Sequence, residues 1–147
     1  MTAVTAVRTA RFAELDVGTL YALLRLRVDV FVVEQHCAYA ELDGHDAEPD
    51  TWHLWTADET GPSAYLRLLA EPGGRRIGRV CTRSDARGTG LAELIMREAL
   101  RLAGSALVGL DAQSQLVAWY ERFGFTPDGP EFLEDGIPHV PMVRPAQ

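Results

Sequence analysis

A polar segment near the middle of the chain, residues 80–92, contains the residue types of an anion-binding loop. It follows an apolar run and leads into a helical pattern, and amide hydrogens at the start of a helix favour a phosphate group because they lack partners within the helix. Gly88 and Gly90 can adopt a positive φ and have no Cβ to block a phosphate. Arg87 can add a charge-assisted hydrogen bond, and Ala92 keeps the next turn small. The segment therefore predicts a phosphate or diphosphate site.

Two common phosphate-binding loops do not fit this segment. The pattern G-x-G-x-x-G fails because Glu93 stands where the third glycine belongs. The Walker A loop fails because all fourteen basic residues of the chain are arginine and none is lysine. The absence of lysine also excludes enzymes that work through a lysine Schiff base.

The sequence on either side of the loop predicts the elements that hold it. Three strand-like runs, at residues 51–57, 63–69 and 76–82, are separated by turn residues and predict an antiparallel meander. After the loop, a helical pattern over residues 88–103 leads to an apolar strand at residues 106–110. A strand, helix and strand in this order favour a parallel pair of strands.

The N-terminal part predicts a strand, a helix and a long loop. Residues 2–12 alternate as a strand does, and Asp16 can cap a helix that ends near Gln35. Residues 36–50 are polar and irregular, which predicts an exposed loop. Its carboxylates are Glu41, Asp43, Asp46, Glu48 and Asp50. This loop could attract a cationic amine or hold a divalent metal through Asp43, His45 and Asp46, but the regular ligand spacing of a calcium loop is absent and no metal is expected.

The C-terminal part predicts one more helix and two strands. The helix is expected over residues 113–123 and closed by Gly124, and a strand follows from Phe125, broken at residues 127–130. A last strand is expected near residues 139–143. Together these elements predict an α/β (α+β) fold with a mixed, mostly antiparallel central sheet flanked by helices.

Two separated motifs resemble the Gcn5-related N-acetyltransferase (GNAT) superfamily. Residues 87–92, Arg-Gly-Thr-Gly-Leu-Ala, match the pyrophosphate-binding signature R-x-x-G-x-A, and they lie between a strand and a helix as that superfamily requires. Residues 113–125 resemble the superfamily's late helix, which ends in a tyrosine followed by a Gly-Phe corner. Gln113 and Leu116 depart from the usual Asn and Ala of that motif.

The N-terminal half resembles the ElaA-like branch of the superfamily. The matching residues are Val30 to Gln35, Cys37, Tyr39, Asp43-Gly44 and, far downstream, Glu134 to His139. The resemblance covers nearly the whole chain. It implies a single GNAT-like domain over residues 1–147, a splayed parallel strand pair in the sheet, and acetyl-CoA as co-substrate.

The resemblance also implies a mechanism and its residues. An amine attacks the thioester directly, without an acyl-enzyme, and Tyr120 points at the coenzyme sulfur and can protonate the departing thiolate. The residues implied to bind the coenzyme are Val80, Cys81, Thr82, Arg87, Gly88, Thr89, Gly90, Leu91, Ala92, Gln113 and Tyr120. Tyr120 and Trp119 could instead serve only as aromatic core residues, and Cys81 is expected to be a buried filler, not a nucleophile.

A protonated amine must lose a proton before it attacks, so a base is needed. The candidates are Glu34, Glu41, Asp43, His53 and His139, of which Glu34, Asp43 and His53 join Tyr120 as predicted catalytic residues. Burial at a helix end could raise the pKa of Glu34, but an ion pair with Arg25 or Arg27 is an equal alternative. His53 could also be a hydrogen-bonded structural residue on its strand.

Composition narrows the partners and the location. A net charge of −7 argues against nucleic acid and suits a cationic small molecule or peptide amine. Two cysteines and no long apolar run predict a cytoplasmic protein without a disulfide framework or a membrane span. An N-acetyltransferase is the first hypothesis, a non-catalytic acyl-CoA-binding module the second, and a homodimer stays open.

Overall fold

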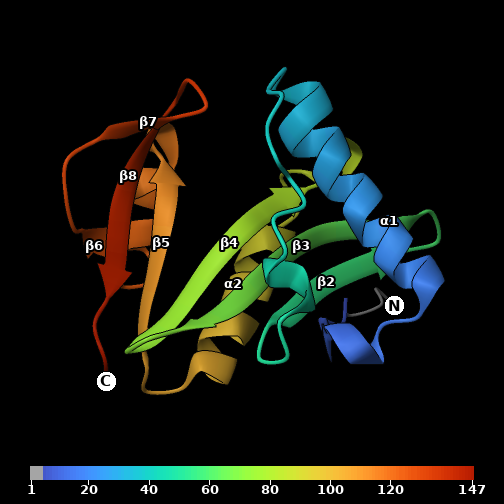
Figure 1. Cartoon of the computed structure of the whole chain (residues 1–147), viewed down its shortest axis with the longest axis horizontal. Helices are drawn as coiled ribbons and strands as arrows, with labels where there is room; N and C mark the ends of the chain where they lie inside the picture. The colour runs from blue at the N-terminus through green and yellow to red at the C-terminus, as the bar shows by residue number, and fades with distance from the viewer. Residues whose placement is uncertain (1–4) are drawn as a thin grey trace.

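An open, twisted sheet forms the centre of the computed structural model, which describes residues 5–147 (Figure 1). Its strands are β1 (Arg8–Arg11), β2 (Trp52–Asp58), β3 (Gly61–Glu71), β4 (Gly74–Thr82), β5 (Leu107–Gln113), β6 (Thr126–Pro127), β7 (Phe132–Glu134) and β8 (Ile137–Arg144). Their order is β1-β2-β3-β4-β5-β8-β6, and β7 pairs with β8. Only the β4–β5 pair is parallel; the other pairs among the described strands are antiparallel.

Helices cover both faces of this sheet. The helix α1 (Val17–Val28) continues into a π-helical segment, η2 (Asp29–Glu34), and packs on β3 from one side. The helix α2 (Leu91–Ala103) packs on β3 and β4 from the other side, and the short α3 (Val117–Glu121) follows β5. In Figure 1, α1 lies in front of the strands and α2 behind them. Short 3-10 turns are Phe12–Glu14, His45–Ala47, Ser84–Ala86 and Ser114–Leu116.

Each face of the sheet has its own apolar core. Leu66 and Leu68 of β3 pack with Ile95 of α2 in one cluster, while Tyr65 of β3 packs with Leu23 of α1 in the other. Successive side chains of a strand point to opposite faces, so one strand supplies both cores. Burial on both faces makes β3 the rigid centre from which β4 and the candidate site extend.

The fold class predicted from the sequence is confirmed. The strands β2 to β4 form the expected antiparallel meander, and α2 connects β4 to its parallel neighbour β5. The side chain of Asp16 accepts a hydrogen bond from the Thr19 amide at 2.7 Å, as predicted for a helix cap. The helical segment that begins there ends at Glu34, next to the predicted Gln35.

Several predicted boundaries are wrong, for local reasons. The helix expected over residues 113–123 shrinks to Val117–Glu121, because the backbone of Gln113 still pairs with His139 in the sheet. The helix expected from residue 88 begins at Leu91, because Gly88 and Gly90 have positive φ and cannot join a right-handed helix. The first strand is limited to Arg8–Arg11, and residues 2–4 of the predicted strand lie outside the described residues.

The strand β7 was not predicted. It forms a hairpin with β8, in which Phe132 pairs with His139 across a tight turn. Asp135 and Gly136 make that turn with φ values of 51° and 78°. Asp-Gly is a common sequence for such turns, so this pair is the sequence signal for the hairpin.

Candidate active site

The strands β4 and β5 pair at one end only and then diverge (Figure 1). Their pairing joins residues 74–76 to residues 107–109; beyond it, β4 stays with β3 and β5 stays with β8. A Cβ on Gly74 would overlap the carbonyl oxygen of Leu107, so glycine is required where the two strands meet. The result is a V-shaped opening in the sheet, closed at this end.

A β-bulge lies in the outer half of β4. Arg67 pairs with Gly78 and Tyr65 with Cys81, so two residues, Arg79 and Val80, stand opposite Leu66. Arg79 has a φ of 55°, which is unusual for a residue with a side chain. Bulges bend the strand that carries them, and this bend falls where β4 borders the opening. No sequence signal marks Arg79 as the bulged residue.

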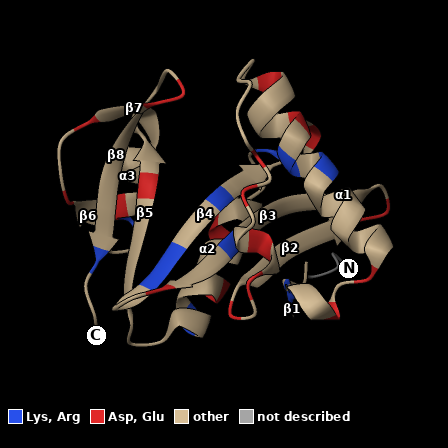
Figure 2. Ribbon diagram, viewed as in Figure 1, with Lys and Arg blue, Asp and Glu red and all other residues tan. Residues whose placement is uncertain are grey.

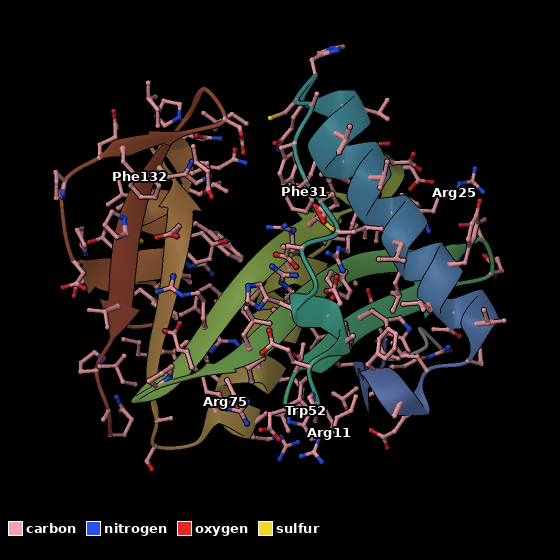
Figure 3. All side chains as sticks on the ribbon, in the orientation of Figure 1. Arg11, Arg25, Phe31, Trp52, Arg75 and Phe132 are labelled. Carbon is pink, nitrogen blue, oxygen red and sulfur yellow. The ribbon has the colours of Figure 1, made fainter. Side chains whose placement is uncertain are left out.

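A cleft of about 560 Å³ occupies the opening between the diverging strands. Of the residues predicted to bind the coenzyme or to act in catalysis, those that line it are Glu34, Val80, Cys81, Thr82, Arg87, Ala92, Gln113 and Tyr120. In Figure 3, Phe31, which lines the cleft, lies near the end of the first helical segment, and Phe132 lies across from it on β7. The tertiary structure therefore joins residues from the start, middle and end of the chain in one cavity.

The glycine loop opens at the start of α2. Gly88 and Gly90 have φ values of 77° and 82°, and a Cβ built on either would meet no atom within 4 Å. Within residues 5–147, none of the backbone amides of residues 87–92 donates a hydrogen bond to a protein acceptor. Gly90 is the residue before the helix, and no side chain caps it. A run of unsatisfied amides at a helix N-terminus is suited to an anion.

Arg87 is already paired at the edge of this loop. Its guanidinium contacts both carboxylate oxygens of Glu34, each at 2.8 Å, and its Nε donates to the carbonyl of Thr82 at 3.0 Å. The hydrogen bond from Arg87 lowers the pKa of Glu34. The predicted rise in the pKa of Glu34 is therefore wrong, and its partner is neither Arg25 nor Arg27. As placed, Glu34 is a poor base, because accepting a proton would break this ion pair.

Most of the segment 36–50 is exposed, as predicted, but two of its carboxylates, Glu41 and Asp46, are only 4% and 8% exposed. Its carboxylates meet arginines from α1, β3 and β4, in the pairs Arg27–Glu41 at 2.9 Å, Arg27–Asp46 at 2.8 Å, Arg67–Asp43 at 2.6 Å, Arg67–Asp46 at 3.2 Å and Arg79–Glu41 at 2.8 Å. Figure 2 shows basic residues along β4 beside the acidic residues of this segment. Three arginines balance three carboxylates in this cluster. The cluster therefore has no excess negative charge with which to attract a cationic amine.

Asp43 and His53 lie in or beside this cluster and do not line the cleft. Partial burial works to raise the pKa of Asp43, but hydrogen bonds from Arg67 and from the His45 amide lower it overall. His53 is 1% exposed, with Nδ1 at 2.7 Å from the Tyr65 hydroxyl and Nε2 at 3.0 Å from the Asp46 carbonyl. Burial lowers the pKa of His53. Both residues are therefore engaged in structural contacts, and the structural alternative for His53 is the better description.

Tyr120 reaches the cleft from α3. Its ring is 6% exposed and meets Trp119 edge-on, with centroids 4.9 Å apart. Burial raises the pKa of Tyr120, so its hydroxyl keeps its proton at neutral pH. Among the described residues no acceptor is hydrogen-bonded to this hydroxyl. Tyr120 therefore combines a core position with a proton that it can donate into the cleft.

The two cysteines differ in their surroundings. Cys81 is 5% exposed, and burial raises the pKa of its thiol to about 12. Such a thiol is a poor nucleophile, as expected for a buried filler. Cys37 is partly exposed, and its Sγ lies 3.6 Å from the Asp135 carbonyl on the far side of the cleft. Within residues 5–147, no three potential metal ligands are grouped closely enough to hold an ion.

The sequence matches a known protein family over most of its length. The model of the acetyltransferase (GNAT) domain matches residues 25–145. The chain belongs to the GNAT acetyltransferase family. The resemblance stated from the sequence is thus confirmed, and the enzyme class expected with it, an acyl-CoA-dependent N-acyltransferase, is that of the family.

Relatives of this GNAT chain extend over almost its whole length. A UPF0039 protein of Mycobacterium tuberculosis is 48% identical over 145 residues, 95% of this chain and 93% of that protein. Protein ElaA of Escherichia coli is 40% identical over 141 residues, 90% of this chain and 91% of ElaA. The crystal structure of an acyl-CoA N-acyltransferase from Pseudomonas aeruginosa superposes with a TM-score of 0.90 at 43% identity, covering 96% of this chain and 99% of that one.

The roles of individual residues in this GNAT chain remain predictions. Gly88, Thr89, Gly90 and Leu91 border the start of α2 and leave their amides available, although these residues do not line the cleft. In the part of the chain that the structure describes, no helix is long and apolar enough to cross a membrane. The buried arginine cluster was missed altogether, because its six members come from separated segments of the sequence.

Proposed function

We propose that the chain transfers an acetyl group from acetyl-CoA to a primary amine of a small molecule or peptide. The observation that supports it most is the run of unsatisfied amides at residues 87–92, which opens beside a cleft that also holds Tyr120. The helix N-terminus and its amides suit the coenzyme diphosphate. The bound coenzyme would supply the acetyl thioester in the V-shaped opening.

The residues of the cleft divide into two tasks. The end of β4, with Val80, Cys81 and Thr82, offers backbone groups that hold the pantetheine arm and polarise the thioester carbonyl. Tyr120 donates the proton that the sulfur needs when it leaves, because its hydroxyl is protonated and engaged with no protein acceptor among the described residues. The acceptor nitrogen approaches from the side of the sheet that α1 covers.

Binding of the coenzyme can be tested with the same substitution at two glycines that share a backbone conformation but lie in different parts of the fold. Gly90 and Gly73 both have a φ of 82° and open space where a Cβ would be, but Gly73 lies in the β3–β4 turn. We expect Gly90→Trp to fill the anion site and Gly73→Trp to leave it intact. With acetyl-CoA at about 100 times Kd, the wild-type protein and Gly73→Trp should gain about 2.7 kcal/mol, a Tm rise of roughly 5–11 °C. Gly90→Trp should show no rise.

Catalysis needs its own assay, because a sensing module would bind the coenzyme without turning it over. Release of free thiol from acetyl-CoA is measured with a panel of small primary amines and of peptides with a free N-terminal amine. Amine-dependent thiol release in the wild-type protein, lost in Gly90→Trp and kept in Gly73→Trp, is the expected result. Coenzyme binding without thiol release for any amine would refute the transferase and favour the sensing module.

A further inference from the structure

His139 is a titratable side chain that lines the cleft and has no assigned role in binding the coenzyme. It lines the cavity together with Tyr120 and Cys81, and its side chain is 12% exposed. On β5, Val108, Leu110 and Ala112 are buried in the core on the α2 face, so their neighbours Asp111 and Gln113 point to the α1 face. His139 pairs with Gln113 across β5 and β8 and therefore faces the same side.

His139 faces the side of the sheet opposite the glycine loop, which leaves that side for the acceptor. Gln113 Nε2 lies 3.5 Å from Gln35 Oε1, which links β5 to the residue that follows η2. The glycine loop lies at the N-terminus of α2, on the opposite face. The coenzyme diphosphate and His139 would thus occupy different ends of one cleft, with the thioester between them.

The hydrogen bond of Nδ1 determines whether Nε2 of His139 carries a proton. His139 Nδ1 is 2.7 Å from the Ile137 carbonyl oxygen, which can only accept. In the neutral ring the proton is therefore on Nδ1, and Nε2 keeps its lone pair. Phe132 stacks on the ring, with centroids 5.8 Å apart and planes at 26°, and holds its orientation. Glu134 Oε2 lies 3.9 Å from Nε2 and can stabilise the imidazolium once a proton arrives.

The other candidate bases are occupied. Glu34 is bound by Arg87, and Asp43 by Arg67. Glu41 is bound by Arg27 and Arg79, and both ring nitrogens of His53 have partners. Among the five bases considered from the sequence, His139 alone combines a place in the cleft with a nitrogen lone pair that no donor engages.

We propose that His139 is the catalytic base that takes a proton from the acceptor ammonium. The inference rests on the proposed acetyl transfer. The ammonium gives one proton to Nε2, the free amine forms the C–N bond, and the C–S bond breaks. Tyr120 gives its proton to the sulfur and recovers one from the nitrogen, which leaves a neutral amide and a free thiol. His139 then returns its proton to water past Glu134, whose side chain is 57% exposed.

Two acceptors of similar shape separate this role from a structural one. Benzylamine is an ammonium at pH 7.5 and needs a base, whereas aniline is neutral and does not. We expect His139→Gln to lower kcat/KM for benzylamine by about 100-fold, the lower end of general-base effects, and to change it for aniline by less than about 3-fold. His45→Gln, a change of a surface histidine outside the cleft, should leave both values as in the wild-type protein.

A second measurement does not depend on turnover. Long-range ¹H–¹⁵N spectra of the neutral ring, assigned by comparison with His139→Gln, should show the proton on Nδ1. A thermal shift with acetyl-CoA that matches the wild-type value shows that the variant is folded and binds the coenzyme.

The outcomes are distinct. A proton on Nε2, an unchanged rate with benzylamine, or equal losses with both amines would each overturn the role of His139. If the wild-type protein releases thiol with no amine of the panel, the proposed function fails, whereas transfer to benzylamine that does not depend on His139 overturns only the role of His139.

Discussion

Replacing Arg27 by methionine is expected to destabilise the protein strongly, because Arg27 is the centre of the buried charge cluster. Its side chain is 1% exposed and contacts Glu41 at 2.9 Å and Asp46 at 2.8 Å. Its guanidinium also lies over the ring of Tyr65, 5.3 Å from the centroid. Methionine has a similar length and no charge, so the variant removes the cation with little change in volume.

The cost follows from what is left behind. Removing one partner of a buried ion pair typically costs about 3–5 kcal/mol, since the remaining charge is uncompensated. Arg67 and Arg79 still neutralise part of the charge on Asp46 and Glu41, which places the expected loss near the lower end, about 3 kcal/mol. For a chain of this size that corresponds to a fall in Tm of roughly 6–12 °C.

The helix provides a matched control. Arg25 lies two positions earlier on α1, its side chain is 75% exposed, and its only ion pair within residues 5–147 is a 4.0 Å contact with Asp29. Figure 3 shows it at the outer edge of the molecule, beside α1. Arg25→Met should change the free energy of unfolding by less than about 0.5 kcal/mol. Urea denaturation at pH 7.5 measures both variants. A loss below about 1 kcal/mol for Arg27→Met would refute the view that this cluster holds the segment 36–50 on the sheet.

Three further predictions follow from single side chains. Tyr120→Phe should lower kcat by about 100-fold with KM for acetyl-CoA unchanged, while Tyr21→Phe, on an exposed face of α1, should have no effect; an unchanged kcat in steady-state thiol release would remove the general-acid role. Burial lowers the pKa of His53, so below the ordinary histidine pKa of 6.5 the unfolded chain binds a proton there and the folded chain does not. The free energy of unfolding, measured by urea denaturation, should therefore fall from pH 7.5 to pH 5.5, and it should fall less in His53→Gln. Iodoacetamide at pH 8 should label Cys37 in the folded protein and spare Cys81, whose thiol is buried with a pKa of about 12; peptide mass mapping that finds Cys81 labelled would contradict this.

The sequence predicted best those features that depend on residues close together in the chain. Alternation of apolar residues predicted the meander, and the order strand, helix, strand predicted the parallel pair. Gly88 and Gly90 were predicted to allow a positive φ in the phosphate loop, and both adopt one, since glycine is the residue that takes a positive φ without cost. The same local reasoning misjudged residues 113–116, because pairing with β8 overrides the helical pattern there.

The choice among candidate bases depended on contacts between distant segments. Glu34 and Arg87 are 53 residues apart, and nothing in the local sequence of either predicts their ion pair. Asp43 lies in an acidic stretch that looks solvated, yet Arg67, 24 residues away, binds it. The availability of a side chain for proton transfer is set by its partners, and partners of this kind are brought together only by folding.

The amino-acid sequence by itself determined the family, the order of the elements and the loop that can receive a diphosphate, because these depend on short-range patterns of residue type. The tertiary structure decided that β4 and β5 diverge, that a bulge at Arg79 bends the wall of the cleft, and that His139 faces the same cavity as Tyr120. Strand divergence and side-chain pairing are properties of the packed sheet, where each position is fixed by neighbours far away in the chain.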